Sequence, residues 1–421
     1  MSEPQRTGST GHSRNKSITK TRPRSSTKGP LDADDSDPLT THQPVAQRAP
    51  ARRPRISSPH PRSSTATPIS QLGEIKPKDF SFLLRPEIYH PLTPLNIPVA
   101  FRNSQKQPNP EAPLEELLAL GHFRAAAIAA VQELTGSGAS GGIDPTDSKR
   151  IFELLYTRLA CLTLIDATPL AAQEVKALED LNDIRKYVDE TTGEHLVPWK
   201  LRVLNVRLQA LGFGDSRRAV MSYHDLAREA RDRIVKAATQ HDNSARETWK
   251  SRLHDLGIHV AGALIELEDL TGAAQHLGTL PDRGDGKMAL SRALMWLHLG
   301  DAESARSCAR KATGSDEDVD KLITALCDMA DGEYEPALEK WRDLMETMDD
   351  EMVGVNMGGR ETLEGLVGSG LSSHTLLFNL STMYELCTEK NRNMKLKLTE
   401  QVAAMEASPA GWEKTNSDFK L

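Results

Sequence analysis

The sequence has few cysteines and no long apolar run, and both features limit the classes of protein to which it can belong. Every apolar run falls well short of the roughly 18 residues that span a bilayer, and the N-terminus lacks the apolar stretch of a secretory signal. The four cysteines stand too far apart for a Cys-x-x-Cys zinc site or a disulfide framework: Cys161, Cys308, Cys327 and Cys387. We therefore expect a soluble protein of a reducing compartment.

Apolar and aromatic residues are also scarce, especially near the N-terminus. Apolar residues form 38% of the chain and aromatic residues 5%, against an apolar share of roughly 45–50% in ordinary globular domains. The first 72 residues contain no Phe, Trp or Tyr, and they hold 12 Lys and Arg against 5 Asp and Glu, although the whole chain has a net charge of −7. So little apolar surface cannot offset the entropy of ordering a backbone. We therefore predict a long disordered arm over residues 1–76, basic and rich in Pro, Ser and Arg.

The roles open to a basic arm, besides that of a solvated tail, are binding an anionic membrane, binding nucleic acid or carrying phosphorylation sites. Its basic residues are too dispersed for a polybasic membrane anchor. No aromatic residues interleave with them to stack on bases. We favour the solvated tail and expect no nucleic-acid partner.

Residues 77–108 have a different composition. Aromatic and aliphatic residues appear suddenly, among them Phe80, Phe82 and Tyr89, and prolines recur at positions 86, 91, 94 and 98. These prolines forbid a regular helix, so the segment cannot form a core of its own. We predict an extended docking segment that lies either on the folded body of this chain or on a partner, and we favour the first alternative.

From residue 109 to residue 421 the pattern is helical. Leu290, Ala293, Leu294 and Leu297 follow the i, i+3, i+4, i+7 spacing of one helix face, and Gly300 then favours a helix end. The same plan returns 32 residues later at Gly332, close to the tetratricopeptide period of about 34 residues. No segment alternates with period two for long enough to indicate a strand. We predict an all-α, tetratricopeptide-like solenoid of helical hairpins.

The sequence carries no pattern typical of catalysis or of a cofactor site. The G-x-G-x-x-G formed by residues 136–141 follows a predicted helix instead of a strand, so it indicates a linker and not a phosphate-binding loop. P-loop and His-Glu-x-x-His motifs are absent, and the histidines do not cluster with carboxylates as metal ligands do. We therefore expect no catalytic, cofactor or metal site, and no enzymatic activity.

One string near the C-terminus is more particular than a generic helical repeat. Residues 373–386, SHTLLFNLSTMYEL, resemble the C-terminal repeat of the trafficking protein particle (TRAPP) complex subunit 12 family. Residues 117–126 and 322–341 are similar to two other hairpins of that family, and the resemblance spans roughly residues 77–421. We hypothesise that the C-terminal hairpins dock on a neighbouring subunit, with four candidate contact residues in the string: Phe378, Asn379, Met383 and Tyr384.

What the resemblance implies is a non-catalytic scaffold subunit of the TRAPP III complex. That complex tethers vesicles in endoplasmic-reticulum-to-Golgi transport and autophagy, and other subunits carry out its nucleotide exchange on a Rab-family GTPase. The expected partners are therefore the other TRAPP subunits and, indirectly, the GTPase. The expected location is cytoplasmic and peripheral to Golgi and endoplasmic-reticulum-Golgi membranes, with membrane contact made through the complex.

The sequence departs from the family near residues 358 and 359. An apolar helix of about a dozen residues is absent between the start at Val353 and the helix that begins near Arg360. Either the chain carries an internal omission or the array is shorter and a partner fills its edge. A half-repeat leaves apolar surface of its neighbours exposed, which costs about 25 cal/mol of stability for each Å². We therefore predict a degenerate, weakly packed repeat around residues 350–370.

The alternative function is that of a generic tetratricopeptide adaptor for chaperone or other protein assemblies. A chaperone-type groove presents Lys, Arg and Asn at fixed helix positions to hold a peptide carboxylate. The sequence alone reveals no consistent set of that kind, and we therefore favour the tethering scaffold.

Overall fold

The computed structural model describes five ranges of the chain: residues 77–138, 141–281, 286–311, 317–348 and 359–421. Within them the protein is all-α, with seventeen α-helices, four short 3₁₀ helices and a single isolated β-bridge between Val188 and His195. The prediction of an all-α hairpin array is confirmed. The predicted disordered arm over residues 1–76 lies outside the described residues.

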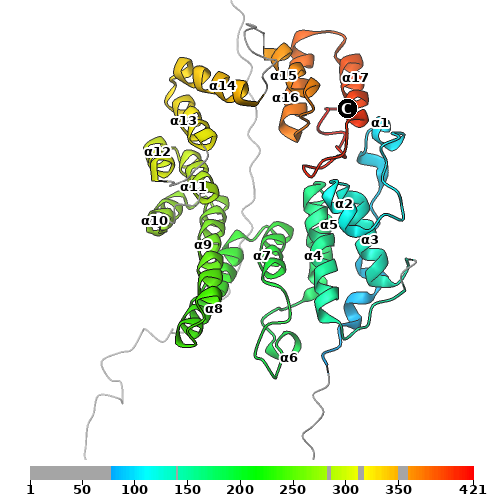
Figure 1. The fold of residues 1–421 in the computed structure, drawn as a ribbon, viewed down its shortest axis with the longest axis vertical. Helices are drawn as coiled ribbons and strands as arrows, with labels where there is room; N and C mark the ends of the chain where they lie inside the picture. The colour runs from blue at the N-terminus through cyan, green and yellow to red at the C-terminus, as the bar shows by residue number, and fades with distance from the viewer. Residues whose placement is uncertain (1–76, 139–140, 282–285, 312–316, 349–358) are drawn as a thin grey trace, which may run out of the picture. The chain divides into compact units, whose positions relative to one another are not determined.

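Figure 1 shows the helices in their order along the chain. The first group comprises α1 (Val99–Arg102), α2 (Leu114–Ala119), α3 (Phe123–Thr135), α4 (Ser148–Leu164), α5 (Thr168–Glu174), α6 (Ile184–Tyr187) and α7 (Trp199–Phe213). The second comprises α8 (Ser216–Thr239), α9 (Asn243–Glu266), α10 (Leu270–Thr279), α11 (Gly286–His298), α12 (Ala302–Lys311), α13 (Glu317–Asp331) and α14 (Tyr334–Met348). The last comprises α15 (Gly359–Gly368), α16 (His374–Cys387) and α17 (Asn391–Ala404).

Consecutive helices pair as hairpins, and α8 with α9 is the longest pair. Tyr223 and Leu226 of α8 share a core cluster with Leu256 and Val260 of α9. An aspartate starts many of the helices, because its carboxylate accepts a backbone N–H that has no partner within the helix. This cap begins α4, α8, α9 and α10, at Asp147, Asp215, Asp242 and Asp269.

The helices from α11 to α14 keep the regular spacing that the sequence predicts. Gly300 and Gly332 both have positive φ angles, of 82° and 83°, so each reverses the chain in the left-handed geometry that glycine tolerates. Asp301 then accepts a 2.8 Å hydrogen bond from the Ser304 backbone N–H. Ala293 and Ala305 are fully buried between the helices, and their small side chains let α11 and α12 approach closely.

The segment before α2 lies on the protein's own helices. Besides α1, it forms three 3₁₀ helices, η1 (Ser81–Leu84), η2 (Pro86–Ile88) and η3 (Pro94–Asn96). Phe80 and Leu83 are fully buried in the same core cluster as Ile151 of α4. The prolines that exclude a long helix thus leave short turns whose apolar side chains cover α3 and α4.

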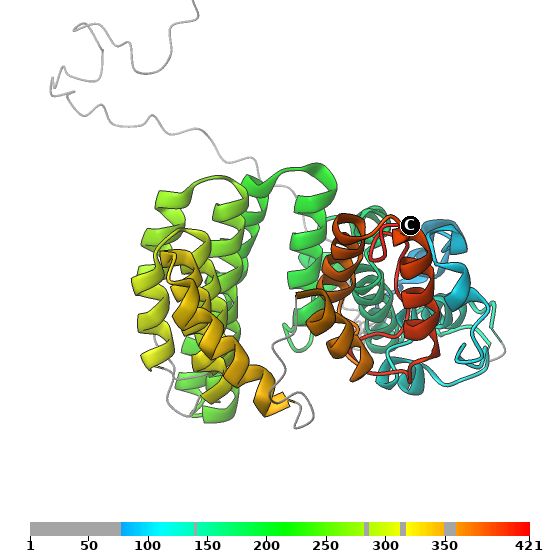
Figure 2. The same cartoon turned by 90° about the horizontal axis from the view of Figure 1, so that it is seen from above.

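The two ends of the described region meet. Phe101 of α1 packs among Leu398 of α17, Trp412 and Phe419, and Figure 2 shows the red C-terminal helix beside the blue and cyan N-terminal segment. The Trp412 backbone N–H donates a 3.1 Å hydrogen bond to the carbonyl oxygen of Gly121. Residues far apart in sequence therefore form one core.

The predicted degenerate repeat is described only in part. Residues 349–358, where the family's additional helix would begin, lie outside the described residues. The helix that follows, α15, packs on α16 and buries Val367 in the C-terminal core. Weak packing around residues 350–370 stays a prediction.

We predict that Gly121→Ala destabilises the fold far more than Gly300→Ala. Both glycines have positive φ angles, so both variants bear a left-handed strain of about 1 kcal/mol. Only at Gly121 does an added Cβ also collide with the chain, 2.0 Å from the carbonyl oxygen of Ser408. We expect Gly121→Ala to lower the free energy of unfolding by about 3 kcal/mol, measured by chemical denaturation. Equal losses in both variants would show that the segment from Ser408 to Trp412 does not pack on this turn.

Candidate functional site

The three predicted docking residues of the N-terminal segment lie together on the protein's own body. The Phe80 ring meets Phe152 edge-on, with 4.9 Å between ring centroids. Tyr89 donates a 2.6 Å hydrogen bond from its hydroxyl to the Leu83 carbonyl oxygen, and burial, reinforced by the charge of Glu174, raises its pKa. Phe82 is half-buried beneath the Lys186 ammonium. Phe80 and Tyr89 therefore pack on the folded body of this chain, which is the first of the two alternatives that the sequence leaves open.

A buried ion pair holds this segment in place. The Arg158 and Glu174 side chains are 2% and 0% exposed and form two hydrogen bonds, of 2.9 Å and 2.7 Å. Arg158 also donates to the carbonyl oxygens of His90 and Ala127, while Glu174 accepts from the His90 backbone N–H. The pair satisfies polar groups from four segments, so it is structural and not exposed to a ligand.

The four candidate contact residues of the C-terminal string lie on α16 but differ in exposure. Tyr384 is buried in the C-terminal core, and Met383 is half-buried. Phe378 is 47% exposed, and Asn379 is exposed beside it. The Lys420 ammonium lies 5.3 Å from the centre of the Phe378 ring. The sequence analysis missed Leu386, which lies two helical turns further along α16 and is 76% exposed.

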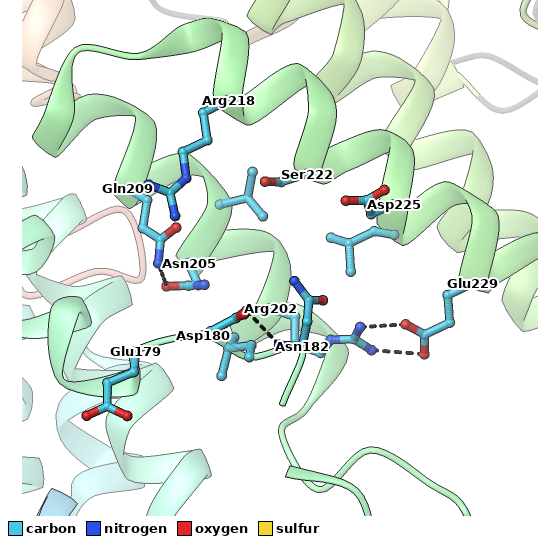
Figure 3. Close-up of a pocket in the computed structure, with 13 residues that line it drawn as sticks. Glu179, Asp180, Asn182, Arg202, Asn205, Gln209, Arg218, Ser222, Asp225 and Glu229 are labelled. Atoms are coloured by element: carbon cyan, nitrogen blue, oxygen red, sulfur yellow. Dashed lines mark hydrogen bonds and ion pairs between the residues drawn. The ribbon is translucent and has the colours of Figure 1, made fainter. Parts of the chain in front are cut away.

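A second candidate site is a polar pocket of about 120 Å³ between α7 and α8. Its walls are the loop at residues 179–182, the polar side of α7 and one side of α8 (Figure 3). From α7 come Arg202, Asn205 and Gln209, spaced by three and four residues so that they share one helix face. Arg218 and Glu229 lie at the two ends of the stretch of α8 that lines the pocket.

One end of this pocket is closed by a two-point ion pair. Arg202 donates to both carboxylate oxygens of Glu229, at 3.0 Å and 2.5 Å. Burial raises the pKa of the Glu229 carboxyl, but the hydrogen bonds and positive charge of Arg202 outweigh it and hold that pKa below its usual range. The Arg202 guanidinium also lies 5.5 Å from the Trp199 ring centre. This end of the pocket is therefore fixed before any ligand arrives.

The middle of the pocket holds a buried amide. Asn205 is only 6% exposed, and its Oδ1 accepts a 3.2 Å hydrogen bond from Gln209 Nε2. Its amide nitrogen has no hydrogen-bond partner among the described residues and points away from Gln209, toward the middle of the pocket (Figure 3). This nitrogen is not among the described buried atoms that lack a partner, so it faces the solvent of the pocket.

The far end of the pocket holds a free cation. The Arg218 backbone N–H donates to Asp215 at the start of α8, but its guanidinium forms no ion pair within the described part of the chain. Figure 3 shows the Arg218 side chain extending toward Gln209 and Asn205. The pocket thus offers a guanidinium and two amides, together with the carboxylates of the loop at residues 179–182 and of Asp225.

The helices around this pocket are strongly basic. Together α7 and α8 hold nine Arg and Lys against three Asp and Glu, in a chain whose net charge is −7. Arg252 of α9 stacks on Trp249, 4.4 Å from its ring centre. Burial and the neighbouring charge of Arg202 lower the pKa of Arg252. The pocket itself has the opposite balance, because four carboxylates and two guanidiniums line it.

Other chemistry is sparse in the described ranges. No group of three or more His, Cys, Asp and Glu side chains there is placed to hold a metal ion. No helix in the same ranges combines the length and the apolar character needed to span a bilayer.

Comparison with known proteins returns no relative: no family model, no curated protein and no solved structure matches the chain.

We predict that Glu174→Gln is strongly destabilising, because it leaves the Arg158 charge buried without a counter-charge. Breaking a buried pair in this way costs about 3–5 kcal/mol. The matched control is Glu406→Gln, which removes a carboxylate that pairs with Lys106 but is 84% exposed, and such pairs contribute about 0–1 kcal/mol. The free energies of unfolding of both variants test this, and similar values would contradict the buried role of the pair.

Proposed function

We propose that the chain is a non-catalytic scaffold subunit of the TRAPP III vesicle-tethering complex. The proposal is supported by the resemblance of residues 373–386 to the TRAPP subunit 12 family and by an all-α hairpin array, an architecture that typically binds proteins. The chain would act in endoplasmic-reticulum-to-Golgi transport and autophagy. It would reach Golgi and endoplasmic-reticulum-Golgi membranes peripherally, through its partner subunits.

The observation that carries the proposal is the outer face of α16. Leu377, Leu380 and Tyr384 turn one face of this helix into the core, while Phe378 and Leu386 remain exposed on another. Scattered exposed apolar residues are normal. Here, however, a half-exposed aromatic and a largely exposed leucine lie within the string that carries the family resemblance. A partner that covers both side chains gains about 25 cal/mol for each Å² of apolar surface buried.

In this role the array positions other chains and performs no chemistry itself. A neighbouring subunit contacts α16 around Phe378, and the rigid packing of α16 against α17 fixes the angle at which that subunit is held. Nucleotide exchange on the Rab-family GTPase is carried out by other subunits. The GTPase is therefore an indirect partner.

A generic protein-binding adaptor is the second candidate function. The polar pocket between α7 and α8 favours it, because its two amides and its guanidinium can form hydrogen bonds with a peptide ligand in any complex. The two candidates differ in which chains accompany the protein in its own cells.

We predict that mild-salt purification of the tagged full chain recovers the other TRAPP subunits, identified by mass. Phe378→Ala combined with Leu386→Ala should reduce their recovery about tenfold or more, because two apolar contacts are lost. The matched control is Ile184→Ala combined with Leu164→Ala, at positions that are 71% and 53% exposed on α6 and α4. The control should retain the partners.

Two results would count against the TRAPP assignment or against the α16 contact. Recovery of chaperones, or of no other chain, would remove the TRAPP assignment and leave the adaptor. Undiminished recovery of TRAPP subunits with the α16 variant would keep the assignment but exclude this face as the contact.

A further inference from the structure

A larger pocket, of about 450 Å³, lies along α8, α9 and α10 and is open to solvent. We call it the apolar pocket, because most of its wall is apolar. The apolar side chains that line it are Ala227, Leu253, Leu256, Val260, Leu280 and Pro281. Three of them, Ala227, Leu256 and Val260, also belong to the buried core between α8 and α9. Pockets of this size and composition typically hold small ligands.

The charges that line the apolar pocket are basic. Arg231 of α8 and Lys250 of α9 are both charged at pH 7, and no Asp or Glu is among the described residues of the lining. Lys250 pairs with Glu247 at 2.6 Å, and Glu247 itself lies outside the lining. Arg231 is exposed and forms no ion pair with a described residue. A ligand therefore meets the full charge of Arg231, whereas the charge of Lys250 is partly offset.

The two cations lie at one end of the apolar pocket. Arg231 is eight residues before the end of α8 at Thr239, and Lys250 is seven residues after the start of α9 at Asn243. Because α8 and α9 form a hairpin with a short turn, both residues lie at about the same height. From Lys250 the lining continues along α9 to Val260, a distance of about 15 Å at 1.5 Å per residue. The pocket thus has a charged end and an apolar length.

The wall on the α10 side is held against α9. The His276 Nε2 donates a 3.0 Å hydrogen bond to the Gly257 carbonyl oxygen. Burial lowers the pKa of His276, so its ring adds no charge at pH 7. Leu280 lies directly over Gly257, where an added Cβ would come within 2.5 Å of the Leu280 Cδ2. This part of the wall is therefore formed before any ligand arrives.

We propose that the apolar pocket binds a single-chain fatty carboxylate, with the carboxylate on Arg231 and Lys250 and the chain along α9 toward Val260. A guanidinium holds a carboxylate through two parallel hydrogen bonds. The chain covers the apolar wall, and each CH₂ group that it buries strengthens binding. The proposal goes beyond the scaffold role, because it assigns a small ligand and not a protein partner.

The same features disfavour other occupants. Inorganic phosphate would meet the charge of Arg231 but would leave the apolar wall uncovered. The first 72 residues of this chain carry 12 Lys and Arg against 5 Asp and Glu, so like charges would oppose their approach to Arg231. A fatty carboxylate meets both requirements, because it joins an apolar chain to a single negative charge.

The test measures the binding of soluble amphiphiles to the full chain by isothermal titration calorimetry. Decanoate should bind at least about tenfold more tightly than hexanoate, because a shorter chain buries fewer CH₂ groups. It should also bind about tenfold more tightly than decylammonium, which has a chain of the same length and the opposite charge.

Three results of this titration would overturn the proposal. The first is the absence of decanoate binding. The second is equal affinity for decanoate and decylammonium, because the positive charge would then have no role and any apolar chain could be the occupant. The third is sedimentation of the chain with vesicles of phosphatidylcholine and phosphatidylserine when decanoate does not bind, because the ligand would then be a membrane lipid.

Two pairs of variants locate the site. Arg231→Gln should weaken decanoate binding about tenfold, whereas Arg217→Gln removes the same charge from α8 outside the lining and should not. Thr279→Trp should obstruct the pocket, whereas Thr271→Trp adds the same side chain to α10 outside the lining. All four positions are exposed, so we expect each variant to fold, which circular dichroism checks. Equal decanoate affinities within either pair would overturn the proposal.

Discussion

The buried pair of Arg158 and Glu174 is the constraint on which the N-terminal half of the array depends. Taking two such charges out of water costs several kcal/mol for each ion, and their mutual attraction offsets this only when the remaining hydrogen bonds are made. Several of those bonds come from the main chain of His90, which donates to Glu174 and accepts from Arg158. The segment around Tyr89 is therefore part of the core, since α4 and α5 cannot bury their charges without it.

The fixed position of His90 directs the chain that follows. It leads into η3 and α1, whose Ile97 and Phe101 are buried in the same cluster as α17 and Trp412. The C-terminal segment returns to the turn between α2 and α3, where only the absence of a side chain at Gly121 lets it approach. One buried charge pair thus helps to close the C-terminal core, while the outer face of α16 stays uncovered by the described residues.

The sequence predicts the local features well because each depends on a few neighbouring residues. Gly300 ends a helix and Asp301 starts the next by rules that operate within one turn, and the prolines near Phe80 exclude a long helix for the same reason. The polar pocket could not be predicted in this way. Asn205 looks like an ordinary solvated residue of α7, and it is buried because α8 and the loop at residues 179–182 cover it. Nor does an apolar segment reveal from its sequence whether it covers its own chain or a partner.

The two candidate contact surfaces belong to different cores, and this bears on the proposed scaffold role. Phe378 and Leu386 are carried by the helix that packs with α17 and Trp412, whereas the polar pocket lies on the cluster formed by α7, α8 and α9. The two clusters share no residues, and contacts without shared partners usually contribute additively. Occupation of one surface therefore leaves the affinity of the other almost unchanged. In the proposed scaffold role, two such surfaces would allow two partners to bind in either order.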